Sequence, residues 1–155
     1  KKQPTWEKGN VMKLTVLTDN HTFIDQYYLG EPALCFLIET DGRKLLLDTG
    51  YSNVCLRNSQ AMGIDLAQVD TIVLSHGHND HTGGLVPLRD AGLLAGKTVL
   101  VIAHRMRTVA GADQIVVLAD GTVAEKGSPE ALMQRDGLYA HMVKLQTESQ
   151  GWTIE

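Results

Sequence analysis

Four side chains of the kinds that bind metal ions occur within six residues, directly after a short apolar segment. The segment 71–74 is β-branched and apolar, which predicts a buried strand. It is followed by His76, His78, Asp80 and His81, and then by the pair Gly83-Gly84. Four such residues cannot all lie on one face of regular structure, so they favour a loop at the carboxyl end of a strand. Imidazole and carboxylate bind zinc, iron, manganese and nickel, and we favour a metal site over a solvated polar loop.

This motif carries a family resemblance. His76-x-His78-x-Asp80-His81, between an apolar strand and Thr82-Gly83-Gly84, resembles the signature of the metallo-β-lactamase fold. Upstream, Leu45-Leu-Leu-Asp48-Thr-Gly50 resembles the strand with that family's structural aspartate, and the similarity covers about residues 11–88. It implies metal-dependent hydrolysis or related chemistry, with His76 and His78 at one ion and Asp80 and His81 at a second. The family's later ligands, two histidines and a bridging aspartate, are not recognisable downstream.

The expected cofactor is a transition metal ion, zinc in the first place, with iron and manganese as alternatives. One mononuclear site needs three protein ligands plus water, so the four residues suffice for one ion. Asp80 is also the candidate catalytic residue, because it can act as a ligand or as a base. Asp48 ends the strand 43–47 and is expected to orient a ligand histidine; the alternative is a loop cap. His21 is interpreted as a surface histidine.

From residue 96 onward the chain resembles a different family. Gly96-Lys-Thr-Val-Leu-Val-Ile-Ala-His104-Arg105 and the segments 112–121 and 125–132 are similar to the last third of an ABC transporter ATPase, and the match continues to about Gln146. A histidine at the position of His104 contacts the γ-phosphate of ATP in that family. The phosphate-binding motif G-x-x-x-x-G-K-[ST] does not occur in the sequence, so we expect no ATP binding.

The two resemblances together predict an engineered or accidental chimera with an α/β fold. We expect mixed sheets with flanking helices, in which a metallo-β-lactamase-like half (11–90) joins an ABC-ATPase-like piece (96–150) through a βαβ unit. Residues 1–155 would form a single hybrid domain with a loose tail at 1–10. The crossover rule makes the strands 71–75 and 98–103 parallel, with a helix at 85–94 between them. His104 would then stand on the same sheet edge as the histidine loop, beside the metal ligands or as a satisfied polar residue.

Local signals predict the remaining elements. Asp41-Gly42 and Asp120-Gly121 are typical of tight hairpin turns, which join 33–39 to 43–47 and 114–118 to 122–126. Ser52 predicts the start of a helix that runs to about residue 62 and ends at Gly63. Ser128-Pro129-Glu130 predicts another helix start.

Composition limits the functional classes. At 155 residues the chain fits one compact domain with a core, and a net charge of −4 without a basic stripe argues against nucleic-acid binding. Cys35 and Cys55 are too few for a disulfide framework and are interpreted as buried thiols. No apolar run reaches membrane-spanning length and no leader pattern follows Lys1-Lys2, so we expect a cytoplasmic protein.

Three functional hypotheses remain open. The first is a metal-binding protein with a partial hydrolase site, weakly active or inactive towards a small-molecule substrate. The second is a non-catalytic recombination product of two folds, and the third, which we disfavour, is a nucleotide-binding fragment. A chain that contains only part of a fold also leaves sheet edges exposed, so we expect that it can self-associate.

Overall fold

The computed structural model describes residues 11–22 and 25–150, so the expected tail at 1–10 lies outside the described residues. The chain forms two compact units, Lys1–Ile102 and Ala103–Glu155, and each is described by itself. The single hybrid domain therefore stays a prediction. In the described part of the chain, no helix has the length and apolar character that a bilayer crossing requires.

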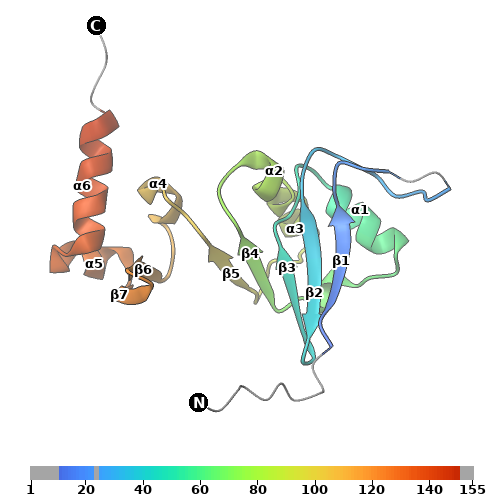
Figure 1. The fold of residues 1–155 in the computed structure, drawn as a ribbon, viewed down its shortest axis with the longest axis horizontal. Helices are drawn as coiled ribbons and strands as arrows, with labels where there is room; N and C mark the ends of the chain where they lie inside the picture. Colours follow the sequence, from blue (N-terminus) through green and yellow to red (C-terminus); the bar gives the residue numbers. More distant parts are fainter. Residues whose placement is uncertain (1–10, 23–24, 151–155) are drawn as a thin grey trace, which may run out of the picture. The chain divides into compact units, whose positions relative to one another are not determined.

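The first unit is built on a five-stranded mixed sheet with the order β1-β2-β3-β4-β5 (Figure 1). The first three strands pair antiparallel, whereas β3 with β4 and β4 with β5 pair parallel. The expected mixed sheet with flanking helices is confirmed. The strands are β1 (Lys13–Thr18), β2 (Cys35–Thr40), β3 (Arg43–Leu47), β4 (Thr71–Leu74) and β5 (Thr98–Val101).

The turn between β2 and β3 has the conformation that its two residues predict. Asp41 and Gly42 have φ angles of 49° and 73°, and Thr40 pairs directly with Arg43. Positive φ at both central positions is the property of a type I′ turn, whose twist matches that of the flanking strands. The hairpin places Asp48 at the end of β3, in the middle of the sheet.

The core of the first unit lies on one face of the sheet. Alternate strand residues point to the same face, and those on β2, β3 and β4 pack against helices α1 (Val54–Ala61) and α3 (Leu85–Asp90). Cys55 from α1 and Leu88 from α3 are both buried in this cluster. Its other fully buried members include Leu17, Cys35, Leu37, Leu46 and Ile72.

The βαβ connection is confirmed, with shorter elements than expected. β4 and β5 are direct parallel neighbours, and α3 lies between them in the chain. The helix ends at Asp90 rather than at residue 94, because Gly92 adopts a φ of 73° and its N–H bonds to the Arg89 carbonyl, 2.8 Å away. A short 3-10 helix, η1 (Leu66–Gln68), precedes β4.

The predicted cap of α1 is wrong. Asn53 occupies the N-cap position without a side-chain cap bond. Ser52 instead donates its hydroxyl to Glu31 Oε2 at 2.6 Å. Glu31, 21 residues earlier in the chain, therefore binds the Ser52 hydroxyl that the local pattern predicts to cap the helix. Gly63, with a φ of 69°, ends α1 as expected.

The second unit contains the hairpin β6 (Ile115–Ala119) and β7 (Thr122–Gly127) with helices α4 (Met106–Val109), α5 (Pro129–Arg135) and α6 (Leu138–Gln150). Asp120 and Gly121 form the expected turn with φ angles of 50° and 74°. Ser128 caps α5 by accepting a bond from Ala131 N, also as expected. The Glu125 carboxylate accepts the Leu138 and Tyr139 N–H groups, each at 2.9 Å, at the start of α6.

Candidate metal centre

Asp48 is the buried anchor of the candidate site. It follows β3 with a φ of 57°, a conformation that aspartate tolerates better than most residues, and its N–H donates to Val73 O on β4 at 2.8 Å. Its Oδ2 lies 2.7 Å from His81 Nδ1, and its Oδ1 accepts the Ser75 N–H at 2.8 Å. The carboxylate therefore joins the ends of two neighbouring strands to a histidine of the motif.

His81 and Asp80 lie on a single helical turn, α2 (Asn79–Thr82), rather than in an irregular loop. The carbonyl of His81 accepts bonds from Thr49 N at 2.8 Å and from Thr49 Oγ1 at 2.9 Å. These bonds fix the backbone of His81 against the segment that follows Asp48. The helical turn is thus bonded, through both its backbone and the His81 imidazole, to the segment that follows β3.

The glycine pair after α2 allows this close approach. A Cβ at Gly84 would overlap the Thr49 carbonyl, and one at Gly83 would overlap the Tyr51 carbonyl. The Gly84 N–H also donates to Gly50 O at 3.2 Å. Glycine is required at these positions because two backbone segments pass where a side chain would otherwise stand.

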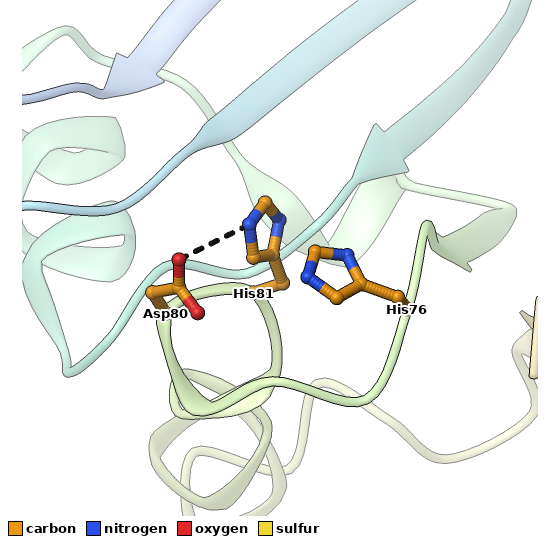
Figure 2. A group of neighbouring side chains, drawn as sticks. All are labelled: His76, Asp80 and His81. Atoms are coloured by element: carbon orange, nitrogen blue, oxygen red, sulfur yellow. Dashed lines mark ion pairs between the residues drawn. The ribbon is translucent and has the colours of Figure 1, made fainter. Parts of the chain in front are cut away.

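Three of the four predicted ligands come together in one group (Figure 2). Candidate ligand atoms of His76, Asp80 and His81 all lie within 4.8 Å of one another. Asp80 Oδ2 lies 3.2 Å from His81 Nε2, and the rings of His76 and His81 have centroids 4.1 Å apart. All three residues are partly buried, so their ligand atoms are held in place and remain accessible to an ion.

His78 stands beside this group and is not one of its three members. Its Nδ1 lies 3.1 Å from His76 Nε2, and the residue is exposed. The two ligand atoms of the His76–His78 pair are therefore nearly as far apart as those of the Asp80–His81 pair.

The donor set fits a transition metal ion. Imidazole nitrogens and a carboxylate oxygen are the ligands of such ions, and a ligand histidine commonly donates its second N–H to a carboxylate. Asp48 provides that carboxylate for His81 at 2.7 Å. The predicted orienting role of Asp48 therefore has a direct geometric basis.

The remaining histidines differ in position. His21 is exposed, and its backbone N–H donates to Asp19 Oδ1 at 2.7 Å. His104 belongs to the second unit, where its ring is exposed and its carbonyl accepts a bond from Gln146 Nε2 at 2.7 Å. Its placement beside the histidine motif stays a prediction.

Sequence reasoning missed the residues that hold the motif in place. Ser75 contacts both Asp48 and His76, and Thr49 holds the carbonyl of His81. Glu31 fixes the next segment by accepting bonds from Tyr51 N at 2.8 Å and Ser52 N at 3.2 Å. The position of Ser75, between a strand and the first histidine, was the one available signal.

The comparisons with known proteins cover the part of the chain that holds this site. The model of the metallo-beta-lactamase superfamily matches residues 29–138. The chain belongs to the metallo-beta-lactamase superfamily. The matched range includes Asp48 and the whole histidine motif, and it extends past residue 88 into the segment that resembles a transporter ATPase.

The similarity to ABC transporters is also confirmed, over a shorter part of the chain. The mitochondrial potassium channel ATP-binding subunit of Pongo abelii is 58% identical over 52 residues, which is 34% of this chain and 7% of that protein. The ATP-dependent lipid A-core flippase of Cupriavidus metallidurans is 52% identical over 58 residues, 37% of this chain and 10% of that protein. The chain thus spans about a tenth or less of the length of these relatives and combines similarity to two families, as a chimera would.

Solved structures of both kinds are similar to the chain. The metallo-beta-lactamase MIM-1 from Novosphingobium pentaromativorans is 26% identical with a TM-score of 0.41, over 57% of this chain and 32% of that one. A bacterial Atm1-family ABC exporter with ATP bound is also 26% identical, with a TM-score of 0.44, over 66% of this chain and 17% of that one.

Proposed function

We propose that this chain is a zinc-binding protein with a partial hydrolase site formed by His76, His78, Asp80 and His81. The observation that carries the proposal is the convergence of ligand atoms from His76, Asp80 and His81 above the buried Asp48. Iron or manganese are the alternative ions. Membership of the metallo-beta-lactamase superfamily supports the same chemistry.

The separations within each pair support direct ligation. Two ligand atoms on one tetrahedral zinc ion lie about 3.3 Å apart when each bond is near 2.0 Å. His76 Nε2 and His78 Nδ1 are 3.1 Å apart, and Asp80 Oδ2 and His81 Nε2 are 3.2 Å apart. Each pair can therefore serve one ion with small side-chain shifts. One ion could instead recruit the group of three, with water completing its coordination.

The chemistry follows from the residues around such an ion. A bound zinc ion supplies Lewis-acid activation of water near neutral pH. The Asp80 side chain is 42% exposed, so its carboxylate can reach a substrate and act as a base. His81 is held by Asp48 and Thr49, which keeps its ring aimed at the same point during a reaction.

We expect hydrolysis to be slow. Catalysis depends on substrate positioning as well as on an activated nucleophile. The later histidines and the bridging aspartate of the family are not recognisable in this chain, so few groups are left to clamp a substrate or a second ion. We therefore expect the chain to bind metal even if its hydrolytic activity is weak or absent.

Elemental analysis of the zinc-loaded, dialysed protein tests the metal site. The wild-type chain and a His21→Ala control should retain zinc in near-stoichiometric amount, and His78→Ala and His81→Ala should retain clearly less. His21 is a matched control because it is a histidine outside the motif. Wild-type protein that retains no more zinc than the His81→Ala variant would overturn the proposal.

Turnover separates the hydrolase from a non-catalytic chimera. A phosphodiester, a lactone and a thioester are each assayed with the zinc-loaded protein, with and without a chelator. Chelator-sensitive hydrolysis that is absent in Asp80→Ala supports the partial hydrolase. Stoichiometric zinc without any turnover supports the non-catalytic alternative. ATP is expected to leave the melting temperature unchanged, since the sequence has no phosphate-binding loop.

A further inference from the structure

We propose that Ser75 is a positioning residue that fixes the tautomer of His76 and connects it to the carboxylate that orients His81. This inference rests on the proposed metal centre, because its consequence is the presentation of a ligand nitrogen. No motif assigns this role to Ser75. It follows from three contacts of the Ser75 hydroxyl group and one of its backbone N–H.

Ser75 lies directly after β4, between the last strand residue and the first histidine. Its backbone N–H donates to Asp48 Oδ1 at 2.8 Å, and its Oγ donates to Asp48 Oδ2 at 2.8 Å. The same Oγ lies 3.0 Å from His76 Nδ1 and 3.4 Å from His81 Nδ1. The hydroxyl is therefore placed between one carboxylate and two imidazoles.

Counting protons assigns each donor. A serine hydroxyl carries one hydrogen, and an ionised carboxylate can only accept. The 2.8 Å contact between Ser75 Oγ and Asp48 Oδ2 thus uses the serine hydrogen. Towards His76, Ser75 Oγ can then only accept, so the hydrogen in the 3.0 Å contact belongs to His76 Nδ1.

This assignment determines which nitrogen of His76 is free. A neutral imidazole with its hydrogen on Nδ1 has a bare Nε2, which can bind a metal ion. His76 Nε2 is also the atom that lies 3.1 Å from His78 Nδ1. In the metal-free protein His78 Nδ1–H can donate to that bare nitrogen, so this contact agrees with the same tautomer.

The same carboxylate holds a hydrogen on Nδ1 of His81. His81 Nδ1 lies 2.7 Å from Asp48 Oδ2, which places a hydrogen on Nδ1. Its Nε2 faces the Asp80 carboxylate at 3.2 Å, on the side where the proposed ion would bind. Asp48 therefore acts on His81 directly and on His76 through Ser75. One buried carboxylate, 4% exposed, thus orients two candidate ligand histidines that stand at the two ends of the sequence motif.

Substitutions can test the role of the Ser75 side chain separately from that of its backbone N–H. The bond from Ser75 N to Asp48 Oδ1 persists with any non-proline residue, so Ser75→Ala keeps the link between the ends of β3 and β4. The variant removes only the hydroxyl that accepts from His76. Ser75→Thr restores a hydroxyl at the same position. Ser59→Ala is the matched control, because Ser59 is buried and donates to Leu56 O at 2.8 Å within α1.

The first measurement is the histidine tautomer in metal-free protein, by nitrogen-15 NMR of the imidazole rings. In wild type we expect His76 in the Nδ1–H form and His81 with a hydrogen on Nδ1. In Ser75→Ala we expect a mixture of tautomers for His76, with His81 unchanged. A wild-type His76 with its hydrogen on Nε2 would overturn the proposal even if no variant folds. Because no metal is present, this result stands whether or not the proposed zinc function does.

The second measurement is zinc affinity, by competition with a chromophoric chelator. Loss of an outer hydrogen-bond partner typically weakens metal binding about 10–100-fold. We expect a loss of that size in Ser75→Ala, recovery in Ser75→Thr and no change in Ser59→Ala. Wild-type affinity and an unchanged His76 tautomer in Ser75→Ala would show that the hydroxyl has no positioning role.

Discussion

Asp48 Oδ2 and His81 Nδ1 lie 2.7 Å apart, although the two residues are separated by 33 positions in the chain. Asp48 is buried and directly follows β3, and His81 belongs to a helical turn that follows β4. The contact is possible because β3 and β4 are parallel neighbours, so both residues leave the sheet at the same edge. Parallel strands with ligands at their carboxyl ends are a recurrent site architecture.

Replacing Asp48 by asparagine should weaken metal binding about 10–100-fold. Asparagine tolerates the φ of 57° at this position, so the backbone is preserved. Its amide has only one accepting oxygen, so either the Ser75 N–H loses its acceptor, or the Ser75 hydroxyl and His81 Nδ1 both lose theirs. Chelator competition measures the effect, and Asp90→Asn, at an exposed ion pair with Arg89, is the control. Equal zinc affinity in both variants would contradict an orienting role for Asp48.

Gly84→Ala should destabilise the first unit by about 3 kcal/mol or more, since its Cβ would overlap the Thr49 carbonyl and lie 3.1 Å from Ser52 O. Backbone atoms on both sides cannot move without breaking the bond from Thr49 N to His81 O. Denaturant unfolding measures the change. Gly111→Ala is the control, because a Cβ there meets no described atom within 4 Å. Similar midpoints for the two variants would show that the segments separate easily.

Features encoded by adjacent residues could be predicted from the sequence. Both Asp-Gly turns formed as expected because positive φ is a property of the two residues themselves. The ligand group was recognisable because its members are close in sequence. The parallel pairing of β4 and β5 followed from the crossover rule for βαβ units, which does not depend on the side chains.

Features that depend on distant partners could not be predicted. Ser52 satisfies every local criterion for a helix cap, yet Glu31 takes its hydroxyl. The turn α2 is four residues long, too short to produce a helical period. Ser75 could not be assigned a role until the Asp48 carboxylate was placed 2.8 Å from its hydroxyl.

Gly121→Val should destabilise the second unit by about 1 kcal/mol or more. Gly121 has a φ of 74° in the turn between β6 and β7, a conformation that a β-branched residue strongly disfavours. The site is open, so the cost arises from the backbone and not from a steric clash with a neighbour. Thermal unfolding beside a Gly111→Val control measures it. An unchanged melting curve for Gly121→Val would mean that the turn does not limit stability.

Cys35 and Cys55 should be unreactive towards a thiol reagent in the native chain and fully reactive after unfolding. Both are completely buried in the core of the first unit, one on β2 and one on α1. The hydrogen bond with Cys55 and burial raise the pKa of the Cys35 thiol well above its ordinary value, so little Cys35 thiolate forms at neutral pH. The same hydrogen bond lowers the pKa of Cys55, so burial is what protects that thiol from the reagent.

Titration with Ellman's reagent at neutral pH tests this expectation. The native chain should show almost no reaction in the time that a free cysteine needs to react completely, and the chain in guanidinium chloride should show two thiols. Thr108→Cys supplies a positive control, because residue 108 is exposed and its thiol should react at once. Rapid reaction of one thiol in the wild-type native chain would mean that the contact between β2 and α1 opens readily, since neither sulfur can meet the reagent while that core is closed.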